Sequence, residues 1–222
     1  MGNSSLVNYT KISPNKTTPR SHKIDTITIH CVVGQCSVET LGNIFADPSR
    51  KASCNYGIGA DGRIGLYCNE SDRSWCSSNA SNDHRAITIE VASDTTHPYA
   101  VNDKAYNSLI NLLVDICKRN GIKQLLWKGD KSLVGKVEKQ NMTVHRWFAN
   151  KSCPGDYLYN KHSEIADAVN KKLGVGAKPS LADDLNLLAK EGVINSPNYW
   201  LTKAPTIQYL PEFIHNMAEK LR

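Results

Sequence analysis

The stretch DTITIHC, residues 25–31, predicts the first strand of the chain. Its β-branched residues alternate with polar ones, which is the two-residue period of a strand that packs one face on a core. A second stretch, AITIEVA at residues 86–92, is almost wholly apolar and predicts a strand buried on both faces. Between them, Asp61-Gly62 separates the short runs 53–60 and 64–68 and predicts a β-hairpin.

Three helices are predicted around these strands. Ser37 predicts the start of a helix that extends to about Ala46, because a serine side chain satisfies the free backbone amides at a helix start. Asn102 or Asp103 predicts the start of a further helix, in which apolar side chains recur at helical spacing, and Asn120-Gly121 is typical of its end. A third helix is predicted from Pro154-Gly155-Asp156 to about Leu173.

Two segments complete the first part of the chain. Residues 142–147 predict one more short strand, and the polar residues 70–85 predict a surface loop. Strands and helices therefore alternate through residues 1–174. The predicted fold class is α/β, with a mixed central β-sheet flanked by helices.

A second, smaller unit is predicted at the C-terminal end. Residues 174–179 (GVGAKP) have the composition of a short linker. After them, Ser180 and Asp183 resemble a capping box, and apolar residues at helical spacing predict a small helical module. The predicted domains are residues 1–174 and residues 179–222.

The composition limits the class of protein. With 222 residues, of which 40% are hydrophobic and 22% charged, the chain can bury the core of one ordinary domain plus a small appendage. Its apolar runs are far shorter than the ~20 residues that cross a bilayer, so we expect no membrane protein. The polar N-terminus shows no secretory signal, and seven cysteines without CxxC pairs favour reduced thiols in a cytoplasm.

The net charge of +6 favours an anionic partner. Basic and acidic residues balance from Lys178 onward, so the whole excess lies before that residue. Nucleic acid, a membrane surface and an acidic wall polymer are the candidates. We expect no nucleic-acid binding, because no helix-turn-helix, zinc-finger or aromatic-basic motif supports it.

Three residues could together hold a metal ion: His30, His145 and Cys153. Imidazole and thiolate are zinc donors, and a catalytic zinc site has three protein ligands with one open position. The spacing from His145 to Cys153 requires a strand followed by a returning loop, which residues 149–152 can supply. From spacing alone, the simpler interpretation is that each histidine is hydrogen-bonded within a strand and that the cysteine is a buried thiol.

Four segments resemble one known family. They are Ile27-Thr28-Ile29-His30, Asn55-Tyr56-Gly57 ahead of Asp61-Gly62, Ala86-Ile87-Thr88-Ile89-Glu90, and His145 followed by Lys151-Ser152-Cys153-Pro154. In this order they look like the motifs of the type 2, zinc-dependent N-acetylmuramoyl-L-alanine amidases, a family that includes phage lysozyme-like amidases and peptidoglycan recognition proteins. The resemblance covers residues 24–173 and outweighs the simpler interpretation of the three donors.

The resemblance implies an activity and a cofactor. It makes His30, His145 and Cys153 the ligands of one catalytic zinc ion in residues 1–174. The bond cut in the family is the amide between N-acetylmuramic acid and L-alanine of peptidoglycan. Zinc lowers the pKa of its water towards ~7 and polarises the carbonyl under attack. Residues 179–222 are then a candidate for cell-wall binding.

Three further residues match catalytic positions of the family. Lys151 would face the oxyanion with its fixed charge, and Tyr56 would bond the reacting oxygen through its hydroxyl. Glu90 is an acid in an apolar strand, where a pKa raised by burial would suit a general base. The alternatives are a solvated lysine, a tyrosine packed in the core and a glutamate that orients a ligand imidazole. Which of the three is the base stays open.

The sequence departs from the family pattern in one segment. Ser74-Trp75-Cys76-Ser77 stands where many relatives have Trp-His-Ala-Gly, which puts the substrate contacts there in doubt. Trp75 is a candidate for stacking on a sugar ring, with a core or loop-anchoring role as the alternative. Cys31 should face away from the metal, because neighbouring strand residues point to opposite faces. We expect three histidines on the surface, namely His84, His97 and His162.

The retained donors favour an enzyme over a non-lytic peptidoglycan-binding protein, because non-catalytic relatives usually lack a metal ligand. Among amidases, the C-terminal module favours a phage or prophage endolysin over a cytoplasmic muropeptide-recycling enzyme. We therefore expect the protein in the host bacterial cytoplasm, from which it acts on the wall after release. Its expected partners are bacterial peptidoglycan and anionic wall polymers, and a homodimer through the C-terminal module stays open.

Overall fold

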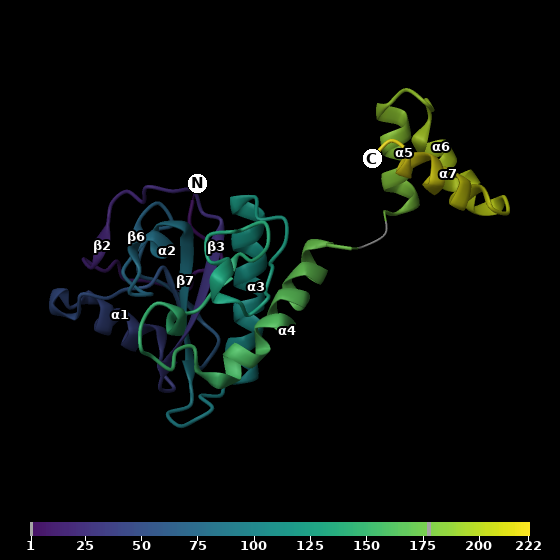
Figure 1. Ribbon diagram of the computed structural model, residues 1–222. Coiled ribbons are helices and arrows are strands. Elements are labelled where there is room, and N and C mark those ends of the chain that lie inside the picture. The colour runs from purple at the N-terminus through teal and green to yellow at the C-terminus, as the bar shows by residue number, and fades with distance from the viewer. Residues whose placement is uncertain (1, 177–178) are drawn as a thin grey trace. The chain divides into compact units, whose positions relative to one another are not determined.

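The computed structural model describes residues 2–176 and 179–222 (Figure 1). The chain divides into two compact units, Met1–Val175 and Gly176–Arg222. Ala177 and Lys178, which belong to the predicted linker, lie outside the described residues. Within the described ranges, no helix combines the length and the apolar character needed to cross a membrane.

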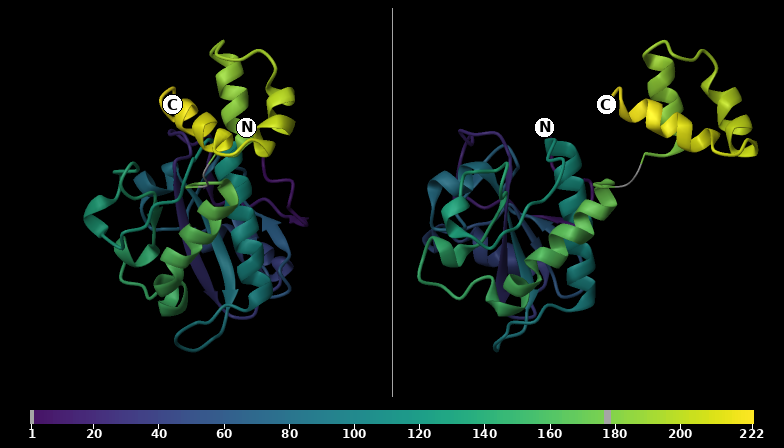
Figure 2. Two further views of the ribbon diagram at one scale, coloured as in Figure 1. Left: turned by 90° about the vertical axis from the view of Figure 1, so that its right-hand side faces the viewer. Right: turned by 45° about the vertical axis from the view of Figure 1, so that its right-hand side comes forward.

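The first unit is built on a six-stranded sheet (Figure 2). The strand order is β1 (Tyr9–Thr10), β5 (Ile64–Leu66), β4 (Tyr56–Ile58), β7 (Ala86–Ser93), β3 (Thr26–Val33) and β8 (Met142–Thr143). The long strands β3 and β7 pair in parallel, whereas β4 and β5 form the predicted antiparallel hairpin. A separate antiparallel pair joins β2 (Lys16–Thr17) to β6 (Arg73–Ser74). The sheet is therefore mixed, as predicted.

Helices cover both faces of this sheet (Figure 1). They are α1 (Val38–Ala46), α2 (Ala80–Arg85), α3 (Asp103–Asn120) and α4 (Gly155–Leu173). α3 and α4 share one apolar core with Ile27 and Ile29 of β3. α1 lies on the opposite side, where Leu41 and Phe45 form a second cluster. This arrangement confirms the predicted α/β class.

Local sequence signals set the ends of the helices. Ser37 accepts a hydrogen bond from the amide of Thr40 at the start of α1, and Asn102 accepts one from Ala105 at the start of α3. Gly121 follows α3 with a φ of 69°, a left-handed conformation that glycine adopts at little cost. The predicted boundaries of these two helices are therefore confirmed.

Two segments differ from the sequence predictions. The predicted loop at residues 70–85 contains β6 and α2, because Asn79 caps a short helix by accepting a hydrogen bond from the amide of Asn82. β8 ends at Thr143, and His145 lies in a short 3-10 helix, η3 (His145–Trp147), rather than in a strand. The expected strand at residues 142–147 is thus only two residues long.

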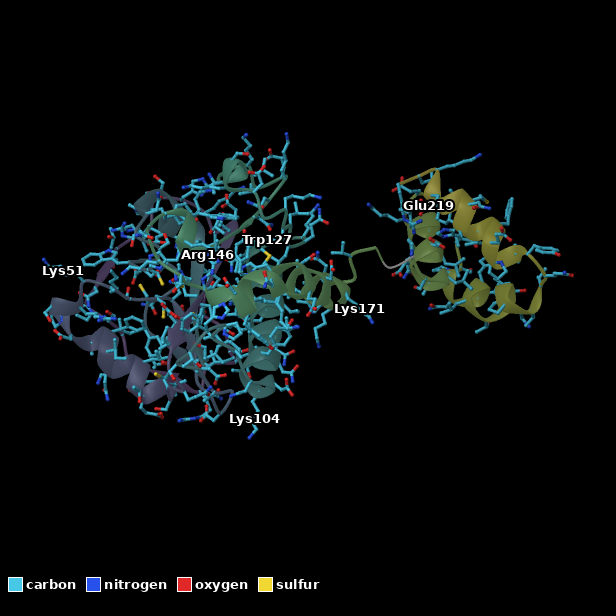
Figure 3. All side chains as sticks on the ribbon, turned by 60° about the horizontal axis from the view of Figure 1, so that its bottom comes forward. Lys51, Lys104, Trp127, Arg146, Lys171 and Glu219 are labelled. Atoms are coloured by element: carbon cyan, nitrogen blue, oxygen red, sulfur yellow. The ribbon has the colours of Figure 1, made fainter. Side chains whose placement is uncertain are left out.

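His162 is buried, which contradicts its expected place on the surface. It lies on the inner face of α4, where its Nδ1 donates to the carbonyl oxygen of Leu158 at 2.6 Å. Its ring centroid is 4.4 Å from that of Trp127, which is labelled in Figure 3. Burial lowers the pKa of His162 to about 4, so the ring is neutral and packs as a core aromatic residue.

Residues 179–222 form a small helical unit. Its elements are α5 (Leu181–Lys190), α6 (Pro197–Lys203), η4 (Ala204–Thr206) and α7 (Leu210–Glu219). Ser180 and Asp183 form the predicted capping box at the start of α5. Leu185 and Ile214 belong to the apolar core of the unit. The helical module is confirmed, although no pattern in the sequence predicted α6.

A buried ion pair connects the hairpin segment to α3. Glu70 is 1% exposed, and its carboxylate accepts hydrogen bonds from Arg119 at 2.6 and 2.9 Å. The hydroxyl of Tyr56 donates to the same carboxylate at 2.7 Å and accepts from the amide of Ser4 at 2.9 Å. Because a buried carboxylate is costly without partners, these contacts hold β4, α3 and the N-terminal segment together.

We expect Glu70→Ala to lower the free energy of unfolding by about 2–4 kcal/mol, because it removes the buried acceptor of Arg119 and Tyr56. Urea denaturation measures this change. The matched control is Glu39→Ala, which removes an ion pair with Arg63 in which both side chains are exposed, so its effect should be much smaller. Equal losses in the two variants would contradict the structural importance of Glu70.

Candidate active site

The pairing of β3 with β7 places two polar residues side by side on one face of the sheet. His30 of β3 lies opposite Glu90 of β7 in the parallel register. Ile29 and Ile89, one position earlier, form the next pair and point into the core on the other face. His30 is fully buried, and the side chain of Glu90 is 16% exposed. The register therefore determines which face of the sheet carries the polar side chains of His30 and Glu90.

His145 and Cys153 complete a cluster of potential metal ligands around His30. One donor atom from each of the three residues lies within 4.8 Å of the others. Cys153 Sγ is 3.3 Å from His30 Nδ1, and the two imidazole centroids are 5.2 Å apart. η3 presents His145, and the turn before α4 presents Cys153. The structure thus brings together the three residues singled out in the sequence.

The chemistry of this donor set fits a zinc ion, since zinc binds imidazole and thiolate. Burial lowers the pKa of His30 to about 3, and the charge of His145 acts in the same direction. Burial also lowers the pKa of His145, with Asp83 opposing and Lys151 adding to the effect. Both imidazoles are therefore neutral at neutral pH, which is the form that binds a metal.

Glu90 lies beside the cluster in an environment that suits proton transfer. Its Oε1 is 4.0 Å from His30 Nδ1. Burial raises the pKa of Glu90 to about 7, while a hydrogen bond from the Cys76 thiol at 3.8 Å and the charge of Arg50 act in the opposite direction. A carboxyl group with such a pKa can accept and return a proton near neutral pH.

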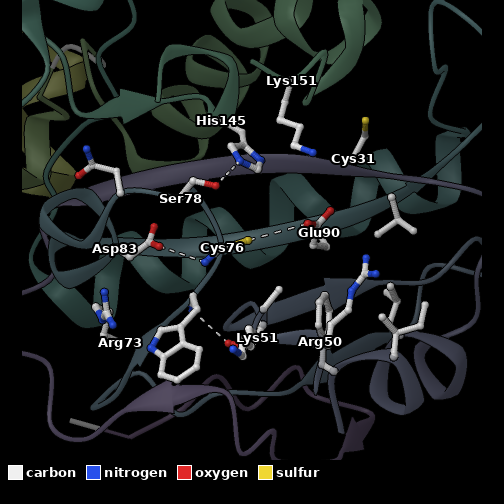
Figure 4. Close-up of a pocket in the computed structure, with 18 of the residues that line it drawn as sticks. Cys31, Arg50, Lys51, Arg73, Cys76, Ser78, Asp83, Glu90, His145 and Lys151 are labelled. Carbon is white, nitrogen blue, oxygen red and sulfur yellow. Dashed lines mark hydrogen bonds between the residues drawn. The ribbon is translucent and has the colours of Figure 1, made fainter. Parts of the chain in front are cut away.

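The cluster opens into a pocket of about 900 Å³ (Figure 4). Lys151 is exposed, and its side chain points into the pocket near His145. Arg50, Lys51 and Arg73 add positive charge to the lining. A pocket with this charge favours an anionic ligand and stabilises negative charge that develops during a reaction.

Trp75 also lines the pocket, where its side chain is half-buried. Its Nε1 donates to Thr17 Oγ1 at 3.0 Å, and the Arg73 guanidinium lies 5.9 Å from the ring centroid. These contacts hold the indole in place at the pocket wall. They agree with the loop-anchoring alternative, and sugar stacking by Trp75 stays a prediction.

Tyr56 is the predicted site residue that the structure does not bring to the cluster. It pairs with Ile89, so its side chain points to the face opposite His30. Its hydroxyl bonds Glu70 and the amide of Ser4, and burial raises its pKa. The alternative of a tyrosine packed in the core describes this position, and Tyr56 has no part in the mechanism proposed below.

Two contacts around the cluster carried no signal in the sequence beyond the polar composition of residues 70–85. Ser78 Oγ lies 3.0 Å from His145 Nε2, a contact that orients the imidazole. The Asp83 carboxylate accepts hydrogen bonds from the amides of Cys76 and Ser77 and so holds the segment that carries Ser78. The segment expected to be a plain surface loop is therefore one wall of the site.

Cys31 lies on the same row of β3 as Ile29 and belongs to the apolar core. This row is opposite to that of His30, as expected from the alternation along a strand. Near the end of β3, Cys31 also reaches the edge of the pocket.

Solved structures share the fold. A mutant endolysin from Bacillus subtilis matches with a TM-score of 0.54 and 18% identity, over 74% of this chain and 99% of that chain. The Staphylococcus aureus hydrolase AmiA in complex with its ligand matches with a TM-score of 0.54 and 15% identity, over 88% and 89%. The endolysin N-acetylmuramoyl-L-alanine amidase LysCS from Clostridium intestinale URNW gives 0.50 and 19%, over 74% and 93%. At identities this low, the structural likeness shows a common fold and nothing more.

Sequence comparison identifies the family. Curated proteins give no match. The family model described as N-acetylmuramoyl-L-alanine amidase matches residues 20–156, which is more than half of the chain and contains His30, Glu90, His145 and Cys153. The family that the motifs resemble is thereby confirmed. The chain belongs to the N-acetylmuramoyl-L-alanine amidase family and is an enzyme of that class.

Proposed function

We propose that residues 1–174 hydrolyse the amide bond between N-acetylmuramic acid and L-alanine in bacterial peptidoglycan, and that the reaction depends on zinc. The family supplies the class of bond and substrate. The observation that carries the zinc dependence is the convergence of His30, His145 and Cys153 within 4.8 Å of one another. Glu90 and Lys151 at the same pocket supply the remaining groups that the hydrolysis needs.

His30, His145 and Cys153 would hold the zinc ion. When bound, zinc polarises the substrate carbonyl and makes water a nucleophile at neutral pH. Burial keeps both imidazoles neutral, and Ser78 fixes the orientation of His145. Cys153 would bind the zinc ion as a thiolate, which is the form that ligates metals.

Glu90 moves the protons of the reaction. Its pKa of about 7 leaves a substantial fraction of the carboxyl ionised at neutral pH. In that form it accepts a proton from the attacking water, and it then returns a proton to the amine that leaves with L-alanine. Both transfers are general acid–base steps, and each needs the carboxyl group to change protonation state.

Lys151 stabilises the negative charge on the substrate oxygen. The ammonium group lies at the same pocket as Glu90 and His145. As the carbonyl carbon becomes tetrahedral, its oxygen gains charge, and a fixed positive group lowers the energy of that state more than that of the substrate. The structure gives Lys151 no ion-pair partner within the described residues, so its charge is available.

We further propose that the enzyme is a phage or prophage endolysin. Residues 179–222 would bind the cell wall, because three aromatic side chains of this unit are at least half exposed: Tyr199, Tyr209 and Phe213. Such an enzyme is made in the host bacterial cytoplasm and acts on the wall after release. There the excess positive charge of the first unit attracts anionic wall polymers, and added salt weakens that attraction.

Digestion of purified peptidoglycan should release new amino termini on alanine and no new reducing sugar ends. A chelator should abolish the release and added zinc should restore it, because the donors fit zinc. Amine labelling and a reducing-sugar assay on the same digest measure both products. New reducing ends in place of amines would contradict the proposed bond.

The same assay separates a lysin from a recycling enzyme. A lysin should have a higher kcat/KM on intact sacculi than on soluble muropeptides, whereas a recycling enzyme should show the reverse order. Preference for soluble fragments would overturn the endolysin proposal and leave the amidase intact.

A cobalt-substituted protein should show a thiolate-to-cobalt absorption band, because one donor is a cysteine sulfur. Cys153→Ser should lose this band. The control is Cys36→Ser, which changes a thiol of the same pocket outside the donor cluster and should keep the band. A band that survives in Cys153→Ser would show that another sulfur binds the metal.

Glu90→Gln should lower kcat by ~10²- to 10⁴-fold, because the amide cannot exchange protons, and it should retain the bound metal.

Lys151→Met should lower kcat by ~10²- to 10³-fold through loss of charge at the oxyanion. Tyr56→Phe is the control and should leave kcat near the wild-type value, since its hydroxyl bonds Glu70. Steady-state kinetics and metal analysis check all three, and a Tyr56→Phe loss as large as that of Glu90→Gln would restore Tyr56 to the mechanism.

A further inference from the structure

Arg146, which is labelled in Figure 3, directly follows His145 and contacts the turn that carries Cys153. Its Nη2 donates to the carbonyl oxygen of Ser152 at 2.6 Å and to Asp156 Oδ1 at 3.0 Å. Its backbone amide donates to the carbonyl oxygen of Cys153 at 3.0 Å. Hydrogen bonds from this one residue therefore connect η3 to the turn before, at and after Cys153.

The Arg146 guanidinium is packed as well as hydrogen-bonded. Its central carbon lies 4.6 Å from the ring centroid of Tyr159 in α4, and the side chain is 24% exposed. Its Nε is buried and has no hydrogen-bond partner within the described part of the chain. A buried donor without a partner costs free energy. The fold accepts this cost at the point where the guanidinium holds the turn of Cys153.

A second segment, residues 97–99, packs on the same turn. His97 Nε2 lies 2.8 Å from Asp156 Oδ2. Gly155 has a φ of 78°, and a Cβ at this position would lie 2.9 Å from the Cβ of Tyr99. The turn is thus tightly packed against this segment, and Arg146 is the contact that fixes it on the side of His145.

We propose that Arg146 is a positioning residue, which holds Cys153 where its sulfur can share one metal ion with His30 and His145. The inference rests on the proposed function in one respect, the assignment of Cys153 as a zinc ligand. Without the Arg146 side chain, the sulfur is no longer fixed relative to His145. Metal binding must then order the turn, and the entropy lost in ordering it weakens the affinity for the metal.

Arg146→Met should raise the Kd for zinc by ~10- to 100-fold, the usual effect of losing a group that orients a metal ligand. Methionine keeps an apolar stem beside Tyr159 and removes both side-chain hydrogen bonds to the turn. Competition with a chromophoric zinc chelator measures the Kd on the full chain. At saturating cobalt the thiolate-to-cobalt band should return in Arg146→Met, because the three ligands are intact, whereas Cys153→Ser should lack it at every cobalt concentration.

Arg85→Met is the matched control. Arg85 makes two hydrogen bonds to the Asp25 carboxylate, at 2.7 and 3.0 Å, and its side chain is 27% exposed. Asp25 precedes His30 by five residues, which in an extended strand is roughly 16 Å. The control therefore removes a similar ion pair from the same unit, and the Kd for zinc should stay at the wild-type value. Far-UV circular dichroism of the metal-free proteins checks that each variant is folded.

A second variant keeps the test decisive if Arg146→Met does not fold. Asp156→Ala removes one of the two acceptors of the Arg146 side chain, so the Kd for zinc should rise by a smaller factor. An unchanged Kd in folded Arg146→Met, or in Asp156→Ala where the first variant does not fold, would overturn the proposal. An equal rise in Arg85→Met would do the same, and none of these results would affect the amidase assignment. Zinc binding by Cys153→Ser as tight as that of the wild type would instead overturn the ligand set on which the inference rests.

Discussion

The structure of the site depends on the parallel pairing of β3 with β7. This pairing runs from Thr26 opposite Ala86 to Val33 opposite Ser93, and it fixes which side chains share a face. In this register the isoleucines of both strands enter the core with α3 and α4, and His30 and Glu90 meet on the other face. A shift by one residue would exchange the two sets, because strand side chains alternate. The apolar core therefore enforces the position of the polar pair.

Burial then gives the polar pair its chemical character. Removal of water disfavours the charged form of each group, so the pKa of His30 falls to about 3 and that of Glu90 rises to about 7. One physical effect thus makes the histidine neutral, which is the form that binds metals, and makes the glutamate a group that can exchange protons at neutral pH. Residues outside the strands complete the site, with His145 from η3 and Cys153 and Lys151 from the segment before α4.

Local signals in the sequence were sufficient for most of the fold, whereas the resemblance to the amidase family singled out the three candidate metal donors that the structure brings together. Ser37, Asn102 and Gly121 act through neighbouring backbone groups, so the helix ends they predict are confirmed. Tyr56 shows the limit, because its orientation depends on a register with Ile89 that no local pattern contains. The burial of His162 depends in the same way on Trp127, which lies far away in the sequence.

We propose that His30, His145 and Cys153 hold one zinc ion beside Glu90. X-ray absorption at the zinc edge of the purified, active protein tests it most directly, because the technique reports the atoms bound to the metal. We expect one zinc per chain with a single sulfur at about 2.3 Å and two imidazole nitrogens at about 2.0–2.1 Å. A first shell without sulfur, or one with several sulfurs, would contradict it.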